Sequence, residues 1–379
     1  MTRRIGILTG GGDAPGLNPA IKWAVRGAQA PTLVEERGEA YEVWGIRYGW
    51  KGLVAEEFQP GPQPPAEWVT PLNMKIVRTW DRDGGTHLSS SRTNPYHPED
   101  DRSELLLKNI EALGLDALIV MGGEDTQQVA FRLHQEGVPV VGIPKTIDKD
   151  VLGTDYTLGF WSAVEENHRI INNLRNPAGS HEFIYLVETM GRHAGHLALE
   201  SGKAAGAVMM LIPEYDFDLD HVCHLLVKRK EEGARYDIVV IAEGAKPGGN
   251  CEMTQDITRD DFGHVHLGGV GEFLGTEIHR RTGLETRSCR PGHIQRGPRP
   301  NFYDVIIGRH FGLAAVEMVT RRQFGRMVAL CEGEVTSTPL EEVVGGLNLV
   351  DVGSQYDTEW LTALQKVFSK DGNPLVRMW

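Results

Sequence analysis

Glycines and charged side chains gather in three short stretches of the sequence, and each stretch follows a run of apolar residues. Residues 9–18 read Thr-Gly-Gly-Gly-Asp-Ala-Pro-Gly-Leu-Asn, residues 122–126 read Gly-Gly-Glu-Asp-Thr, and residues 144–150 read Pro-Lys-Thr-Ile-Asp-Lys-Asp. Glycines ahead of a helix leave backbone N–H groups exposed, and a phosphate can approach them closely. The first stretch is not a Walker A loop, because no Gly-Lys-Ser or Gly-Lys-Thr follows. Taken alone, it indicates a tight turn as readily as a ligand site.

The second and third stretches bring many charges to the ends of two consecutive apolar runs. They carry the carboxylates of Glu124, Asp125, Asp148 and Asp150 and the ammonium groups of Lys145 and Lys149. A single charged loop of this kind is usually a solvated turn, but like charges placed together cost free energy unless a metal or a phosphate organises them. Three such loops favour phosphoryl transfer, in which backbone and lysine hold the donor, carboxylates hold Mg²⁺, and another carboxylate takes the acceptor's proton.

This chemistry needs a scaffold that places the ends of several strands side by side. Short, continuously apolar runs predict strands that are buried on both faces, and amphipathic segments separate them. The predicted strands cover residues 5–9, 41–46, 117–121, 138–143, 183–188, 207–212, 238–242 and 327–331. The alternation predicts an α/β fold with mostly parallel sheets, in which ligands bind beyond the carboxyl ends of the strands.

Two helix starts are marked by residues that favour capping. Asn18 followed by Pro19 predicts an N-cap and a first helical residue, with the helix continuing over 20–30. Thr126 predicts the cap of a helix over 127–135, which Gly137 ends. Residues 245–270 form a long polar connection whose Asp and His residues match no metal-ligand spacing, so we expect a solvated insertion there.

The composition excludes several classes of protein. The 379 residues include 39 Lys and Arg against 52 Asp and Glu, and the net charge of −13 argues against binding to nucleic acid or to an anionic membrane. No apolar run reaches the roughly 18 residues of a membrane span. Four dispersed cysteines, with no Cys-x-x-Cys pair, indicate a reducing compartment rather than a disulfide framework or a zinc site. We expect a cytoplasmic protein with two domains.

The three loops resemble those of the phosphofructokinases, and further motifs follow in that family's order over roughly residues 5–330. They are Gly84-Gly85-Thr86 with Arg92, Met190-Gly191-Arg192, Ile212-Pro213-Glu214, Ala242-Glu243-Gly244 and Gly292-His293-Ile294-Gln295-Arg296-Gly297. Singly, each has an ordinary structural explanation, but the ordered set is highly specific. The resemblance implies two Rossmann-like lobes across a cleft: 1–158 with 294–345 as the larger, donor-binding lobe, and 159–293 with 346–379 as the smaller, sugar-binding lobe.

The resemblance also implies a role for each matching residue. Asp148 would take the proton of the sugar's 1-hydroxyl, with Thr146, Lys145 and Arg192 as the other catalytic groups, and Glu124 and Asp150 would hold Mg²⁺. The implied donor-binding residues are Gly11, Gly12, Arg92, Gly123, Asp125, Thr126 and Lys145. The implied sugar-phosphate residues are Thr146, Asp148, Met190, Gly191, Arg192, Glu243, Arg287, His293 and Arg296. In this family the counterpart of Arg287 reaches in from a neighbouring subunit, which implies a homodimer or homotetramer.

Two positions bear on the phosphoryl donor. Asp125 and Lys145 stand where ATP-using members of the family usually have glycine, and both changes occur together in members that use pyrophosphate. A carboxylate at position 125 would occupy the space of a nucleotide's α-phosphate and repel it, by about 1–4 kcal/mol at about 4 Å depending on screening. The resemblance therefore implies reversible transfer between pyrophosphate and fructose 6-phosphate.

Other functions stay open from the sequence. The nearest alternative is an ATP-dependent 6-phosphofructokinase. Phe183 stands where typical bacterial members have an arginine for the sugar's 6-phosphate, which leaves open another substrate such as sedoheptulose 7-phosphate. The Gly-Gly-acid-x-Thr loop also resembles lipid and NAD kinases, but these leave the motifs at 190–192 and 292–297 unexplained. A catalytically inactive sugar-phosphate sensor would have no use for Asp148.

Overall fold

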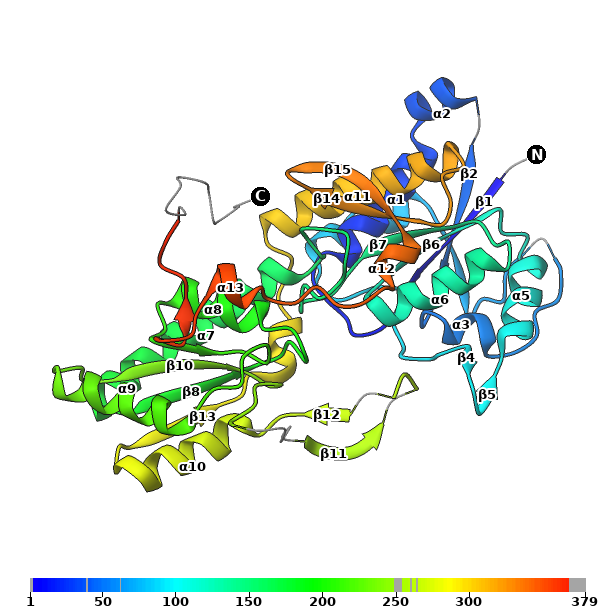
Figure 1. The fold of residues 1–379 in the computed structure, drawn as a ribbon. Helices are drawn as coiled ribbons and strands as arrows, with labels where there is room; N and C mark the ends of the chain where they lie inside the picture. Colours follow the sequence, from blue (N-terminus) through cyan, green and yellow to red (C-terminus); the bar gives the residue numbers. More distant parts are fainter. Residues whose placement is uncertain are drawn as a thin grey trace.

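The computed structural model describes residues 3–38, 40–61, 63–248, 254–259, 261–263 and 265–367. Two main sheets lie apart, each with its own hydrophobic core (Figure 1). The predicted α/β fold with mostly parallel sheets is confirmed. None of the helices in the described ranges is long and apolar enough to cross a membrane.

The larger sheet has seven strands in the order β15-β14-β7-β6-β1-β2-β3. The five inner strands are parallel, and the edge strands β3 and β15 are antiparallel to their neighbours. Because β1, β6 and β7 are adjacent and parallel, the three glycine-rich or charged loops leave the same edge of the sheet. The strands are β1 (Arg3–Thr9), β2 (Tyr41–Ile46), β3 (Val69–Leu72), β6 (Ala117–Gly122), β7 (Val140–Pro144), β14 (Arg326–Cys331) and β15 (Glu334–Pro339).

The smaller sheet has four parallel strands in the order β13-β8-β10-β9. They are β8 (Ile184–Thr189), β9 (Met209–Leu211), β10 (Asp237–Ala242) and β13 (Thr286–Cys289). Helices α7 (Phe160–His181), α8 (His196–Ala205), α9 (Leu219–Glu231) and α10 (Val270–Thr282) belong to this lobe. The C-terminal segment returns to it, since the Tyr356 hydroxyl donates to the Met210 carbonyl at 2.7 Å.

The remaining elements are short or connect the lobes. The helices are α1 (Leu17–Gln29), α2 (Pro31–Arg37), α3 (Lys51–Val54), α4 (Met74–Val77), α5 (Ser103–Ala112), α6 (Glu124–Gln135), α11 (Phe302–Thr320), α12 (Leu340–Val343), α13 (Val352–Gln355) and the 3₁₀ turns η1 (Trp80–Arg82) and η2 (Gly292–Arg296). The short antiparallel pairs are β4 (Tyr96–His97) with β5 (Asp100–Asp101), β11 (Thr254–Arg259) with β12 (Val265–Leu267), and β16 (Tyr356–Asp357) with β17 (Thr362–Ala363).

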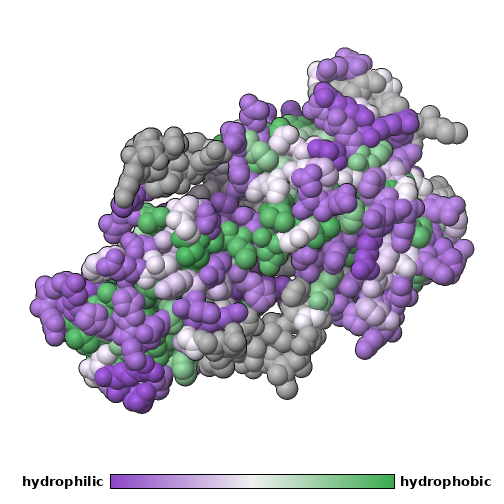
Figure 2. Space-filling model, in the orientation of Figure 1, coloured by the Kyte–Doolittle hydropathy of each residue, from purple (hydrophilic) through white to green (hydrophobic). Residues whose placement is uncertain are grey.

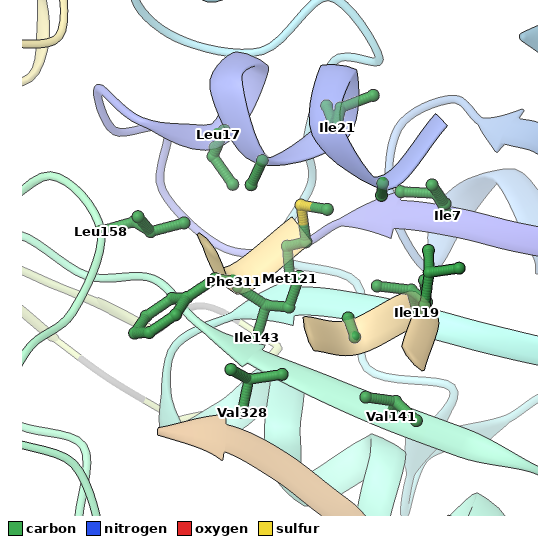
Figure 3. Close-up of a cluster of buried hydrophobic side chains, with 14 of the residues drawn as sticks. Ile7, Leu17, Ile21, Ile119, Met121, Val141, Ile143, Leu158, Phe311 and Val328 are labelled. Carbon is green, nitrogen blue, oxygen red and sulfur yellow. The ribbon is translucent and has the colours of Figure 1, made fainter. Parts of the chain in front are cut away.

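One face of the larger sheet packs against α1 and α11. Buried aliphatic side chains from β1, β6, β7 and β14, including Ile7, Ile119 and Val141, meet Leu17 and Ile21 of α1 (Figure 3). Burying each such side chain contributes about 1.5–3 kcal/mol. The core therefore fixes the edge from which the three loops emerge.

Hydrophilic residues cover most of the visible surface, and hydrophobic residues show mainly near the middle of the molecule (Figure 2).

A buried carboxylate fastens the point where the chain first crosses to the smaller lobe. Asp304, fully buried on α11, accepts hydrogen bonds from the Tyr156 hydroxyl at 2.8 Å, the Gly159 N–H at 2.7 Å and the Ser162 N–H at 3.2 Å. Burial raises the pKa of Asp304 to about 6. The start of α7 is thus tied to the larger lobe by one side chain.

Both predicted helix starts are wrong, the first by two residues and the second by three. Helix α1 begins at Leu17 after Gly16, whose φ of 95° suits glycine, while the fully buried Asn18 amide donates to the carbonyls of Asp83 and Gly84, both at 3.1 Å. Helix α6 begins at Glu124 after Gly123, so Thr126 lies within its first turn. Glu124 and Asp125 are the first two residues of α6, where the helix dipole favours negative charge.

The insertion over 245–270 is more structured than predicted. It contains the antiparallel pair β11 and β12, and Phe262 between them is half-buried against the core of the larger lobe. The expectation of a merely solvated insertion is therefore wrong. Asp260 and His264 lie outside the described residues.

The close packing of α1 on α11 gives a stability prediction. A Cβ atom at Gly312 would lie 2.3 Å from the Ala20 carbonyl oxygen and 2.8 Å from the Ala24 nitrogen. We expect G312A to lower the free energy of unfolding by about 1–3 kcal/mol, because the two helices must move apart. Urea denaturation measures this, with E317A at an exposed position of α11 as a control expected to stay within about 0.5 kcal/mol of wild type. Equal stability of G312A and wild type would contradict the packing.

Candidate active site

One cavity beyond the carboxyl ends of β1, β6 and β7 collects residues from both lobes. It brings together thirteen of the residues implicated from the sequence: Gly11, Gly12, Arg92, Gly123, Glu124, Asp125, Thr126, Lys145, Thr146, Asp148, Asp150, Arg192 and Arg296. These residues are up to 285 positions apart in the chain (296 − 11). The parallel order of the strands places their loops at one edge, and this produces the cavity.

The cationic part of the cavity is buried. Lys145 follows the last residue of β7 and is 3% exposed, and its ammonium group donates a hydrogen bond to the Gly12 carbonyl. Arg296, 7% exposed, donates from Nη1 to the Asp13 carbonyl at 3.0 Å, while its buried Nε has no hydrogen-bond partner in the part of the chain that the structure describes. Burial, with Arg296 nearby, lowers the pKa of Lys145 to about 7. A bound polyanion would offset this desolvation and restore the charge.

The backbone at Gly12 leaves no space for a side chain. A Cβ atom there would lie 2.9 Å from Nη1 of Arg296. Glycine therefore lets the first loop approach both cations closely. The N–H groups of Gly10 and Gly11 hold this loop in place, because they donate to the carbonyls of Met121 and Ser91, both at 2.9 Å.

The anionic part of the cavity lies on the loop after β7 and at the start of α6. Asp148 is 5% exposed, and within the described ranges the enclosed Oδ1 atoms of Asp148 and Asp150 have no hydrogen-bond partner. Burial, with Asp148 nearby, raises the pKa of Asp150 to about 7. Burial and the neighbouring Asp125 also raise the pKa of Glu124. Unsatisfied buried carboxylates are costly, so they indicate a cation or a proton donor that binds here.

The loop that carries Asp148 is held by its own threonines. The Asp148 N–H donates to the Thr146 hydroxyl at 3.0 Å, and the Thr157 hydroxyl donates to the Thr146 carbonyl at 2.7 Å. These bonds fix the position of the Asp148 backbone, so the carboxylate needs little reorganisation to act.

The described residues offer two carboxylates to a divalent cation rather than a complete cage. No group of three or more His, Cys, Asp or Glu side chains within the described ranges is arranged to hold a metal ion. Glu124 and Asp150 both line the cavity and supply hard oxygen ligands. Mg²⁺ is commonly bound by one or two carboxylates together with substrate phosphates and water. The residues present therefore fit a cation that arrives with a phosphorylated donor.

The smaller lobe contributes the loop after β8. Arg192 has a φ of 49°, unusual for a non-glycine residue, and its N–H donates to Glu243 Oε1 at 3.2 Å. The Met190 N–H donates to the Gln295 side chain at 3.2 Å. Burial, with Asp148 nearby, raises the pKa of Glu243 to about 7. Arg192 thus lines the cavity, with Glu243 next to it and near Asp148.

Two residues implicated in sugar-phosphate binding lie elsewhere in this chain. His293 is exposed on η2, and Arg287 is half-exposed on the edge strand β13. The Arg287 guanidinium carbon lies 4.2 Å from the centre of the Phe183 ring, so the two side chains stack. Neither cation lines the cavity of its own chain.

Three further residues line the cavity that the sequence did not single out. They are His193, Phe262 and Leu347. Phe262 is an aromatic residue inside an otherwise polar connection, which was a usable signal. Leu347 carried none, because its position depends on a late return of the chain to this site.

Comparisons with known proteins point to one family. A family model described as Phosphofructokinase matches residues 4–319. The chain is 45% identical over 350 residues to the pyrophosphate--fructose 6-phosphate 1-phosphotransferase of Streptomyces coelicolor, covering 92% of this chain and 96% of that relative. It is 40% identical over 347 residues to ATP-dependent 6-phosphofructokinase 3 of the same organism, with the same coverage.

A solved structure extends the likeness to the whole fold. The pyrophosphate-dependent phosphofructokinase of Marinobacter aquaeolei superposes with a TM-score of 0.75 at 18% identity, covering 98% of this chain and 95% of that one. The fold class predicted from the sequence is thereby supported independently.

The carboxylates give a pH prediction. Cation binding requires ionised carboxylates, and the pKa of Asp150 is raised to about 7, so affinity is lost as the pH falls through 7. We expect Mn²⁺, used as a probe, to bind about tenfold more weakly at pH 6 than at pH 8, as calorimetry would measure. D150N should bind weakly at both pH values. Equal affinity of the wild type at pH 6 and pH 8 would contradict the assignment.

Proposed function

The chain belongs to the phosphofructokinase family, and from this premise we propose that it transfers a phosphoryl group between pyrophosphate and the 1-hydroxyl of fructose 6-phosphate. The products are phosphate and fructose 1,6-bisphosphate, and the reaction runs in both directions. The choice of donor rests on the position of Asp125, which lines the cavity on the first turn of α6. Lys145, which contacts the first glycine loop, lines the same cavity.

Asp125 discriminates between donors by charge and by volume. Pyrophosphate ends where a nucleotide continues into its α-phosphate and ribose. A carboxylate beside that path repels the α-phosphate and fills its space. The 45% identical Streptomyces coelicolor relative named for pyrophosphate supports this choice. Because a 40% identical relative is named for ATP, an assay with both donors is needed to decide between them.

Asp148 is the base in the proposed reaction. The Oδ1 atom of Asp148, which has no hydrogen-bond partner among the described residues, accepts the proton of the sugar's 1-hydroxyl. At the same time, the oxygen of this hydroxyl attacks the nearer phosphorus of pyrophosphate. The bond from this phosphorus to the bridging oxygen breaks, and the second phosphate leaves. Lys145, Arg92 and Arg192 line the cavity and stabilise the charge on the transferred group and the leaving group.

Glu124 and Asp150 would hold Mg²⁺ in this proposal, since both are oxygen ligands on the cavity wall. The ion would neutralise charge on the donor's oxygens. Gly11, Gly12, Gly123 and Thr126 line the same region of the cavity and would orient the donor.

The sugar would lie between the lobes. Near Asp148, it would be contacted by Met190, Gly191, Arg192, Thr146 and Glu243. We assign residues 1–158 and 294–345 to the donor lobe and 159–293 with 346–379 to the sugar lobe, of which 368–379 lie outside the described residues. Closure of the lobes would exclude water and protect pyrophosphate from hydrolysis.

Arg287 and His293 would reach the sugar's 6-phosphate only in an oligomer. Both lie outside the cavity of their own chain, and Arg287 is presented on an edge strand. A homodimer or homotetramer would bring Arg287 to a neighbouring cavity. The free thiols of Cys223, Cys289 and Cys331 agree with a reducing, cytoplasmic setting.

The donor assay tests the proposal directly. We expect turnover of fructose 6-phosphate with Mg²⁺ and pyrophosphate, and little or none with ATP, because Asp125 repels the α-phosphate. D125G should weaken pyrophosphate use and admit some ATP. A coupled assay of fructose 1,6-bisphosphate measures both, with sedoheptulose 7-phosphate as a second acceptor. Robust ATP turnover with none on pyrophosphate would overturn the donor assignment.

The base has its own test. We expect D148N to lower kcat by about 10²–10⁴-fold, because the amide has nearly the same shape but cannot take a proton. Binding of both substrates should persist in calorimetry. D83N, at an exposed carboxylate of the larger lobe that lies outside the cavity lining, is the control and should retain kcat. Retention of wild-type kcat by D148N would show that another group is the base.

A further inference from the structure

The loop that carries Asp148 and Asp150 passes through an unfavourable backbone conformation. Lys149, between the two carboxylates, has a φ of 57°, which lies in the left-handed region that non-glycine residues rarely adopt. Strain of this kind persists only where surrounding contacts impose it, and it is common at active sites. Something must therefore hold Lys149 in place.

The holding contacts come from Asn348, almost 200 residues later in the chain. Its side-chain amide donates to the Lys149 carbonyl at 2.8 Å, and its backbone N–H donates to the Asp150 carbonyl at 2.8 Å. The preceding residue, Leu347, pairs with Val151 as an antiparallel bridge and lines the cavity. Asn348 thus contacts the peptide units on both sides of Asp150.

The segment around Asn348 is itself fastened to the smaller lobe. The Asn348 carbonyl accepts from Nε2 of His196, the first residue of α8, at 3.1 Å. Glu214 Oε1 accepts from the Val350 N–H at 2.9 Å and from the Gly195 N–H at 2.8 Å, beside the loop that carries Arg192. The catalytic loop of one lobe is therefore connected to the sugar-binding loop of the other through residues 348–350.

We propose that Asn348 is a positioning residue, whose side-chain amide holds the Lys149 peptide in its left-handed conformation and thereby aims the Asp148 and Asp150 carboxylates into the cavity. The inference rests on the proposed phosphoryl transfer, because it assigns Asn348 to that reaction. An amide donor is required at this point, since a carboxylate of the same shape would face the Lys149 carbonyl with another acceptor. Asn348 itself does not line the cavity.

The test compares N348A and N348D with wild type in the full-length enzyme. We expect both to lower kcat at least tenfold while the KM for the sugar stays within twofold, because most residues proposed to bind the sugar, such as Met190, Arg192 and Glu243, lie outside the loop that Asn348 contacts. N73A is the matched control: Asn73 caps α4 by accepting from the N–H groups of Lys75 and Ile76, and its loss should leave kcat unchanged. Wild-type kcat in both N348A and N348D would overturn the proposal.

A rescue separates positioning from general damage. Glycine adopts a positive φ without steric cost, so K149G should need less support from Asn348. We expect N348A/K149G to recover at least threefold in kcat over N348A. No recovery, with both variants folded by circular dichroism, would also overturn the proposal. If N348A fails to fold, the same comparison of N348D with N348D/K149G decides.

The donor assignment and this inference fail in different ways. Each variant is compared with wild type, using the donor and sugar that the wild type turns over. A wild type that uses only ATP would contradict the proposed donor, while the ratio of variant to wild-type kcat would still test Asn348.

Discussion

Burial of opposite charges around one cavity is the constraint on which this structure depends. Asp148, Asp150 and Glu243 lie close together with Lys145 and Arg296, and Asp148 Oδ1, Asp150 Oδ1 and Arg296 Nε have no hydrogen-bond partner among the residues that the structure describes. Such an arrangement is costly without ligands, because buried charges lose their hydration. In the proposed reaction, a polyanionic donor that arrives with a divalent cation would supply both missing charges. The shifted pKa values of these groups are those expected of a site that binds such a pair of ligands.

The rest of the molecule holds this costly site in place. Parallel strands of the larger sheet bring the glycine loops and the carboxylates to one edge, and Asp304 ties the first crossing to the smaller lobe. Gln295 joins the turn η2 to the loop of Met190. Asn348 holds the strained Lys149. Each contact links parts of the chain that are distant in sequence, so the two lobes act on one reaction centre.

The choice of donor depends on a few side chains rather than on the fold. Relatives named for pyrophosphate and for ATP share a similar level of identity with this chain, so the family alone does not select the donor. In our proposal, Asp125 selects the donor by repelling a group that only a nucleotide has. In the smaller lobe, the Arg287 guanidinium stacks on the ring of Phe183.

The sequence by itself determined the fold class, most strands and most of the cavity lining, because buried parallel strands are continuously apolar and the charged loops follow them directly. It misplaced the starts of α1 and α6, since Asn18 is used for a tertiary contact instead of a cap and the acidic residues open α6 themselves. Only the tertiary structure decided that Phe262 and Leu347 reach the cavity, that Arg296 lies beside Lys145, and that Arg287 and His293 point elsewhere. These positions depend on contacts between segments far apart in the chain. A local pattern can mark a residue such as Phe262 as unusual, but it does not say which distant segment that residue contacts.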